Sequence, residues 1–212
     1  MSTRSQFLVL GGMVALFAHA GAAQTSRLSF AAGGGFTEPM RYSNGPLKVG
    51  FNLTGSVGVK PSKHSALAAE FGYNNMGINR STLNNLSVPN GSVRMYSVTV
   101  QPTVHFNPEG RVDVYSTVGG GYCRRTIEFT EPTTAIVNAF NPFFGFFPVE
   151  IPAQSVLGSS TQNKGGINGG VGIGIRVSND SAMRVFAETR YHHVFTSGRD
   201  TNYMPVTFGL RW

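Results

Sequence analysis

Apolar and polar residues alternate in eight segments of this chain, and residues that favour turns bound each segment. The clearest segment is 47–59, in which nearly every second side chain is aliphatic or aromatic. Successive side chains of a β-strand point to opposite sides, so this alternation predicts strands that each have one apolar face. The eight predicted strands are 27–36, 47–59, 66–76, 93–106, 111–125, 166–177, 183–195 and 204–212.

We expect the apolar face of each strand to contact lipid. In the second predicted strand this face holds Leu47, Val49, Phe51, Leu53, Val57 and Val59, opposite Lys48, Asn52, Thr54 and Ser56. In the fourth, sixth and last predicted strands the outward residues are Tyr96, Val98, Val100, Val104, Phe106, Ile167, Val171, Ile173, Ile175, Val177, Val206, Phe208, Leu210 and Trp212. Pro102 cannot donate a ladder hydrogen bond, so we expect a β-bulge there.

The connections between these strands alternate between short and long. Short connections cover 60–65, 107–110 and 178–182, whereas 37–46, 77–92, 126–165 and 196–203 are longer. An even number of strands with short turns at one end and longer loops at the other is typical of outer-membrane barrels. Closure also gives every backbone N–H and C=O in hydrocarbon a partner. The pattern therefore predicts an all-β fold, an eight-stranded antiparallel up-and-down transmembrane β-barrel.

Outward aromatic residues gather near the predicted strand ends, which predicts two girdles at the membrane interfaces. On the side of the longer loops these residues are Phe36, Tyr73, Tyr96, Tyr122, Tyr191 and Phe195, and on the other side Phe106 and Trp212.

The N-terminus has the composition of an export signal. Arg4 precedes the apolar run 7–18, and small residues follow up to Ala23. This arrangement predicts a cleaved signal peptide over residues 1–23 and a barrel domain over 24–212. The apolar run is too short for a spanning helix, which needs roughly 20 residues. We expect the chain to be exported to the outer membrane of a diderm bacterium.

Composition and charge fit a barrel whose interior is polar. Only 13% of the residues are charged, and the formal net charge is +7. On the inward phase lie Arg27, Lys48, Arg125, Arg176, Arg184, Arg190 and Arg211, against Glu70, Asp113 and Glu188. We expect Glu70, Glu188 and Arg190 to form an ion cluster across the lumen, because they fall near mid-strand. The interior of an eight-stranded barrel is only wide enough for side chains, so we expect this cluster to plug it.

The connection 126–165 is the least regular segment of the chain. It contains an apolar cluster of five phenylalanines, Phe140, Phe143, Phe144, Phe146 and Phe147. Loops of this length usually have a function or are disordered. One interpretation places the phenylalanines on the barrel rim or the outer leaflet. The other makes them a binding surface for apolar ligands or a partner.

The sequence offers no support for metal, cofactor or nucleotide chemistry. His192 and His193 are adjacent on a predicted strand and point to opposite faces, so they do not share a metal ion in the lumen. Motifs for phosphate loops, dinucleotides and zinc are missing from the sequence. Cys123 is the single cysteine, so we expect it to serve packing. We expect no catalytic residues, no metal, no cofactor and no nucleic-acid partner.

Several of these features together resemble a known family. The signal sequence, the glycine-rich strand 29–36, the Glu188-x-Arg190-Tyr191 strand and the end 205–212 resemble small eight-stranded outer-membrane barrels of the OmpA-like and opacity-type porin families. The resemblance implies a structural, adhesive or weakly channel-forming protein that is a monomer in the outer-membrane bilayer. It also implies recognition by the barrel-assembly machinery through the strand that ends at Trp212. The chain stops at the eighth predicted strand, so a peptidoglycan-binding domain is not expected.

Two other classes of barrel remain as alternatives. Lipid A deacylases place a Ser two residues after a His near the end of the penultimate strand, whereas here Phe195 follows His193 at that spacing and the nearest serine is Ser197. Without a serine beside an oriented base, hydrolysis is not expected, and we predict that the protein is not an enzyme. A soluble lipocalin-like barrel would carry its apolar residues inside, opposite to the predicted phase.

Overall fold

The computed structural model describes residues 27–40, 47–178, 182–196 and 200–212. The predicted signal peptide, residues 1–23, lies outside the described residues. Among the described residues, no helix has the length and apolar character needed to cross a membrane.

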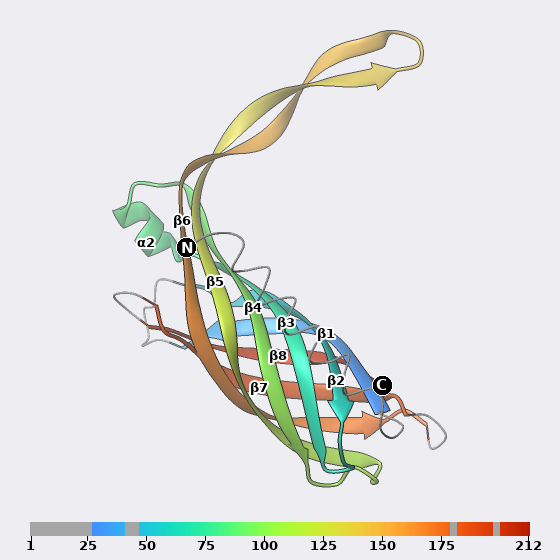
Figure 1. Cartoon of the computed structure of the whole chain (residues 1–212). Coiled ribbons are helices and arrows are strands. Elements are labelled where there is room, and N and C mark those ends of the chain that lie inside the picture. Colours follow the sequence, from blue (N-terminus) through green and yellow to red (C-terminus); the bar gives the residue numbers. More distant parts are fainter. Residues whose placement is uncertain (1–26, 41–46, 179–181, 197–199) are drawn as a thin grey trace, which may run out of the picture.

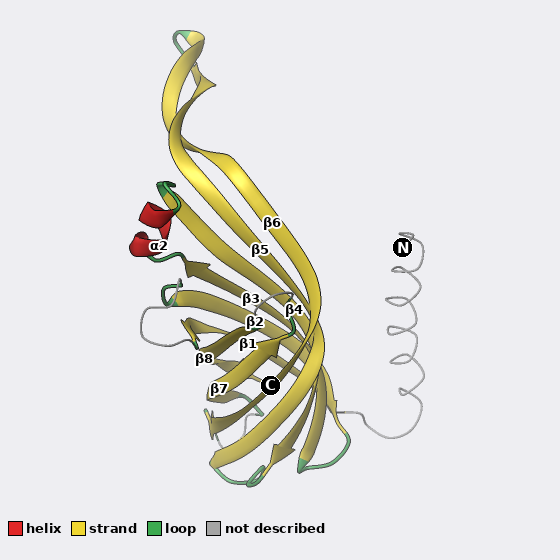
Figure 2. Cartoon of the chain, turned by 90° about the vertical axis from the view of Figure 1, so that its left-hand side faces the viewer, coloured by secondary structure: helices red, strands yellow, loops and turns green. Residues whose placement is uncertain are grey.

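Eight antiparallel strands form one closed barrel in chain order, and the last strand pairs with the first. This confirms the predicted fold class (Figures 1 and 2). The strands are β1 (Arg27–Pro39), β2 (Gly50–Lys60), β3 (Ser65–Gly77), β4 (Asn90–His105), β5 (Val112–Asn141), β6 (Gly145–Arg176), β7 (Arg184–Val194) and β8 (Thr201–Arg211).

The seam between β1 and β8 is fixed at its turn-side end by Phe30 and Trp212. The backbone N–H of each residue donates to the carbonyl oxygen of the other at 2.9 Å. Their rings stack with centroids 6.1 Å apart. The predicted interfacial Trp212 therefore also completes the ladder that closes the barrel.

Apolar side chains cover the outside of the barrel in the predicted phase. Phe51, Leu53, Ile173 and Phe208 are all at least 40% exposed, whereas Asn52, on the opposite face of β2, is 1% exposed. Outside such a barrel this exposed apolar surface is the surface that lipid covers. Leu47 is the exception, because it is partly buried against the apolar cluster inside the loop-side end of the barrel.

The expected bulge at Pro102 is wrong. Pairing of β4 with β5 runs to Val100↔Gly120 and resumes at Thr103↔Thr117 in an unchanged register. Pro102 therefore sits in a short interruption of the ladder, where its missing N–H leaves no unpaired donor. The Thr117 hydroxyl oxygen lies 3.3 Å from the carbonyl oxygen of Pro102.

The segment 126–165 is a β-hairpin and not the irregular loop that we expected. β5 and β6 continue far beyond the barrel wall and pair with each other as far as Asn141↔Gly145. The ladder shifts register once, between Phe129 and Thr130, where the hairpin leaves the wall. Figure 1 shows the two strands as a twisted ribbon that projects away from the barrel. Cross-strand backbone hydrogen bonds suffice to order this segment, so its lack of apolar alternation did not exclude strands.

A short helix that the sequence analysis did not predict lies in the connection after β3. It is α2 (Arg80–Asn85), and its Leu83 is buried. The helix stands at the loop side of the barrel, beside the base of the long hairpin (Figure 2). Leu83 packs in the apolar cluster inside the barrel, which fixes the helix over the mouth.

Candidate functional site

The structure brings Glu70, Glu188 and Arg190 together inside the barrel. Arg190 on β7 donates from Nη1 and Nη2 to Oε1 and Oε2 of Glu70 on β3, at 2.6 and 2.8 Å. Arg190 also forms an ion pair through Nε with Glu188 on its own strand. In the order of the ring, β3 and β7 stand opposite each other. The bidentate pair therefore crosses the lumen from wall to wall.

A polar network extends the ion cluster around the barrel. Gln101 donates to Glu70 Oε1 at 3.1 Å and to the Thr99 hydroxyl at 2.9 Å. Thr117 in turn donates to the Gln101 side-chain oxygen at 3.2 Å. These residues are all buried. Hydrogen-bonded partners on several strands hold the carboxylate of Glu70 in one geometry, which is what a buried charge requires.

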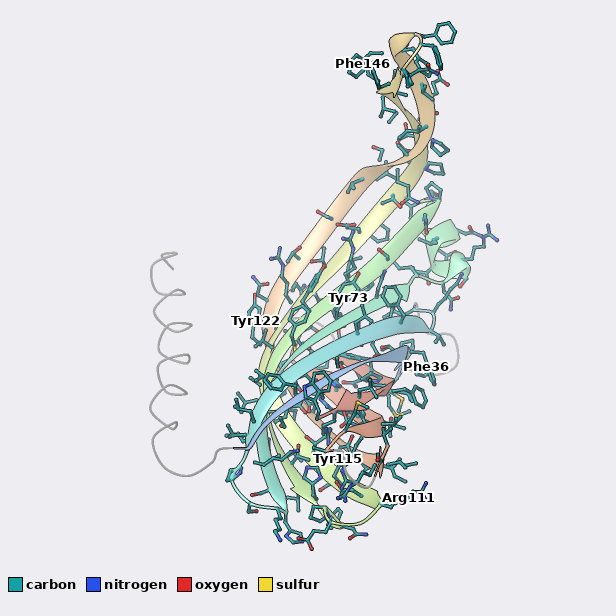
Figure 3. All side chains as sticks on the ribbon, turned by 90° about the vertical axis from the view of Figure 1, so that its right-hand side faces the viewer. Phe36, Tyr73, Arg111, Tyr115, Tyr122 and Phe146 are labelled. Atoms are coloured by element: carbon teal, nitrogen blue, oxygen red, sulfur yellow. The ribbon has the colours of Figure 1, made fainter. Side chains whose placement is uncertain are left out.

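Aromatic and basic side chains fill the lumen on the turn side of this cluster. The Arg211 guanidinium carbon lies 4.3 Å from the centroid of the Tyr115 ring, and Arg211 Nη2 lies 3.8 Å from Glu188 Oε2. Tyr115 is fully buried in the lower part of the barrel (Figure 3). Its ring occupies the space over Gly172, where an added Cβ would come within 2.3 Å of it. The cavity that remains beside the cluster has a volume of about 40 Å³, which is room for water molecules only.

A buried hydrogen bond and an exposed ion pair join residues at the turn side of the barrel. His105 Nδ1 lies 2.6 Å from Asp113 Oδ2, and both side chains are buried. Lys63 and Glu109 join the β2–β3 and β4–β5 connections in an exposed ion pair. The hydrogen bond from Lys63, together with its charge, lowers the pKa of the Glu109 carboxyl.

The interior on the loop side of the ion cluster contains an apolar cluster, which the sequence analysis missed. Its buried residues are Met76, Ile78, Leu83, Val93, Met95, Cys123, Val194 and Tyr203. Above them a cavity of about 860 Å³ opens at the mouth of the barrel. A signal was present in the sequence, because Val93 and Met95 are apolar and take the inward phase of their strand. The loop-side part of the lumen therefore combines this apolar cluster with buried polar side chains such as Thr37, Asn52 and Asn74.

The five phenylalanines of 126–165 gather at the tip of the long hairpin. Phe143 and Phe144 are 91% and 84% exposed, and the rings of Phe140 and Phe146 meet with centroids 5.1 Å apart. Figure 3 shows Phe146 at the end of the ribbon, far from the barrel wall that carries Tyr73 and Tyr122. The phenylalanines of the tip thus contact one another or are exposed, and they do not rest on the barrel rim.

The two adjacent histidines face opposite sides of β7. His192 is buried inside and stacks on Tyr203, with centroids 4.7 Å apart. His193 contacts the Asn202 side-chain oxygen through Nδ1 at 2.7 Å, and the ring of Phe195 stands edge-on against it. Ser197 lies outside the described residues. Within the described ranges, no three His, Cys, Asp or Glu side chains come close enough to hold a metal ion.

Comparisons with known proteins agree with this architecture. Residues 8–212 match the family model of the outer membrane protein beta-barrel domain. Neisserial surface protein A is similar with a TM-score of 0.52 and 14% identity, over 87% of this chain and 93% of that chain. A major outer membrane protein from Thermus thermophilus is similar with a TM-score of 0.57 and 10% identity, over 89% of this chain and 99% of that chain. No curated protein matches the chain.

Proposed function

The chain belongs to the outer membrane protein beta-barrel domain family, and on this basis we propose that it is a closed barrel that presents the β5–β6 hairpin as an adhesive surface outside the cell. In this proposal the barrel anchors the hairpin in the outer membrane and conducts no solute. The five phenylalanines at the tip make the contact, with an apolar surface on another cell or a partner protein.

The shape of the hairpin carries the proposal. Beyond Thr130, β6 is the only strand that pairs with β5 among the described residues, and the two continue as a ribbon from Glu131↔Ser155 to Asn141↔Gly145. At a rise of roughly 3.3 Å per residue, this ribbon reaches about 36 Å beyond the wall. Exposed apolar clusters on proteins are typical of interaction sites. A contact surface held at such a distance reaches past the headgroup layer of its own membrane.

The ion pairs in the lumen support the part of the proposal that excludes conduction. Arg190 spans from β7 to Glu70 on the opposite wall, and Tyr115 and Arg211 fill the space beneath it. Opening a water path would separate charges that are buried and paired, at a cost of several kcal/mol.

Adhesion is tested on cells that express the full chain. Cells with the native hairpin should bind to octyl-coated beads more strongly than cells without the protein. Changing the five tip phenylalanines to serine should reduce bead binding to the level of cells without the protein. The matched control is Ile136→Ser with Ile151→Ser, which removes exposed apolar residues from the stem and leaves the tip intact. Equal binding by the tip variant and the native chain would overturn the adhesive role.

Conduction is tested in planar bilayers with the refolded protein. We expect no stepwise channels from the native chain, and the same silence from Glu188→Ala, since Glu70 and Arg190 still bridge the lumen in that variant. Stepwise, anion-selective channels from the native chain would instead identify a small porin with a basic lumen.

The proposal does not include lipid hydrolysis. Phe195 occupies the position where a deacylase of this shape carries its serine, and its ring packs against His193. Overexpression should leave the acyl chains of lipid A intact in mass spectra. Loss of one acyl chain that depends on His193 would establish an enzyme.

A further inference from the structure

A second site lies inside the mouth of the barrel, and it is independent of the hairpin. We propose that the cavity of about 860 Å³ binds a single-chain amphiphile whose anionic head, a carboxylate or phosphate, pairs with Arg125. The alkyl chain of this ligand lies along the apolar lining of the cavity. The site goes beyond the proposed adhesive function, because it uses none of the tip residues.

The cavity has the size and lining of a ligand site. Its volume falls within the range of roughly 300–1,000 Å³ that is typical of small-molecule pockets. Its apolar lining includes Val93 of β4, Ile127 and Phe129 of β5, Leu86 directly after α2, and the bridged pair Leu47 and Ile78. An alkyl chain placed here would remove apolar surface of both the ligand and the cavity from water, which favours binding.

The cavity is open at the mouth of the barrel and closed at its inner end. Tyr203 and Met76, both fully buried, belong to the apolar cluster beneath it, and the Arg190 bridge lies deeper in the lumen. An alkyl chain that enters the cavity from the loop side therefore remains in the loop-side part of the lumen. Binding is expected here, not passage through the barrel.

Arg125 supplies the charged end of the site. Its guanidinium donates to the Thr201 hydroxyl at 2.7 Å and to the Gln162 side-chain oxygen at 3.2 Å. Both acceptors are neutral, and within the described part of the chain no carboxylate forms an ion pair with Arg125. The inward arginines Arg190 and Arg211 differ, since each lies beside a carboxylate.

The partly buried charge of Arg125 therefore favours an anion that enters the cavity. Its two Nη atoms are already held in place by neutral oxygens, so the planar fork is preorganised for a carboxylate or a phosphate.

Three other charged residues line the rim of the cavity. Lys48 adds a second positive charge, and Glu38 and Asp200 are acidic. Asp200 lies 3.7 Å from His193 Nε2, and Glu38 is exposed, so water screens its charge. The buried end of the site thus remains positive.

The test uses the purified protein in phosphatidylcholine nanodiscs, with empty nanodiscs as the blank. Decanoate, decyl phosphate and decanol are titrated, and binding is followed by ligand-observed NMR. At least one of the two anions should saturate at one per barrel and bind about tenfold more tightly than decanol, the effect of a charge-assisted hydrogen bond. The tighter anion identifies whether the head is a carboxylate or a phosphate.

Variants distinguish the residue that binds the anionic head from the residues that contact the alkyl chain of the ligand. Arg125→Gln should weaken anion binding about tenfold and leave decanol unchanged. Arg124→Gln is the matched control, because it removes the same charge from the outer wall one residue away and should change nothing. Ile127→Trp should block all three ligands by filling the cavity.

Folding of each variant is checked by its heat-dependent shift in gel mobility. Anion binding by folded Arg125→Gln equal to that of the native chain would overturn the proposal. So would uptake by the protein no greater than that of the empty nanodiscs.

Discussion

Arg190 contacts two buried carboxylates in the lumen. It joins β7 to Glu70 on the opposite wall and also pairs with Glu188 beside it. The Arg190 guanidinium lies between the two buried carboxylates, and Arg211 adds a second positive charge beside Glu188. We therefore expect Arg190 to stabilise the barrel and, in the proposed function, to block the lumen.

Replacing Arg190 with Met should lower the free energy of unfolding by about 3–5 kcal/mol, because buried Glu70 loses its charged partner and Glu188 keeps only the more distant Arg211. Urea titration of the refolded barrel, followed by the fluorescence of Trp212, measures the change. As a control, Arg124→Met on the exposed outer wall should change it by less than about 0.5 kcal/mol. A loss below about 1 kcal/mol for Arg190→Met would show that the cluster relaxes or takes up water.

Gly172 is required by the ring of Tyr115 and not by backbone conformation. A Cβ at Gly172 would lie 2.3 Å from the Tyr115 ζ carbon, so Gly172→Ala should destabilise the barrel by about 1–3 kcal/mol. Tyr115→Ala in the same chain should recover part of the loss, since the two side chains compete for one space. Gly174→Ala is the control, because its nearest neighbour, Arg184 Cδ, is 3.6 Å away. Strictly additive urea-unfolding energies would contradict this account.

At the scale of elements, the two faces of each barrel strand lie in different environments. Outward residues such as Ile173 must be apolar because they contact lipid. Inward residues must fit the packing of a narrow lumen. This division explains why the alternation predicted the faces of β2, β4, β6 and β8 correctly, while it failed beyond the wall. The stem of the β5–β6 hairpin lies beyond the membrane, so no apolar alternation marks its strands.

Ile173→Arg should block assembly or cost about 2–4 kcal/mol, because it places a charge on the lipid face. Thr54→Arg should cost less, since Thr54 faces the lumen beside the small cavity. The yield of folded barrel in refolding assays measures both. Equal tolerance of the two changes would contradict the assigned faces.

The stem of the hairpin should be dispensable for folding. Glu131 and Ser155 are cross-strand partners, so a two-residue Asn-Gly turn in place of 132–154 closes the shortened hairpin. We expect the free energy of unfolding in urea to change by less than about 1 kcal/mol, because the removed residues pair only with each other. A shortened chain that fails to fold would mean that the hairpin contributes to barrel formation.

At the scale of the whole molecule, the described structure has two distinct ends. The short connections, with Arg111 among them, gather at one end, and α2 and the long hairpin stand at the other (Figures 2 and 3). In outer-membrane barrels the short turns face the periplasm and the long loops face outward. We therefore expect the ion cluster to lie toward the periplasm and the cavity at the mouth to open to the outside.

This orientation predicts the accessibility of the two ends on intact cells. Chymotrypsin should cut next to Phe143 or Phe144, which are the most exposed aromatic residues of the tip. An epitope inserted after Lys63 should bind antibody only after the outer membrane is permeabilised. Labelling of that epitope on intact cells would reverse the orientation.

Local alternation was enough to predict the strands, their number and the face that each presents to lipid, because it is a direct consequence of the pleat. The inward charges Glu70, Glu188 and Arg190 could be read from the same phase. That Arg190 reaches Glu70 was visible only in the folded barrel, because this contact depends on closure and stagger of strands far apart in the chain. The long hairpin, α2 and the cavity at the mouth were likewise visible only in the folded structure. Cross-strand hydrogen bonds and contacts between residues far apart in the chain produce no periodic pattern in the sequence.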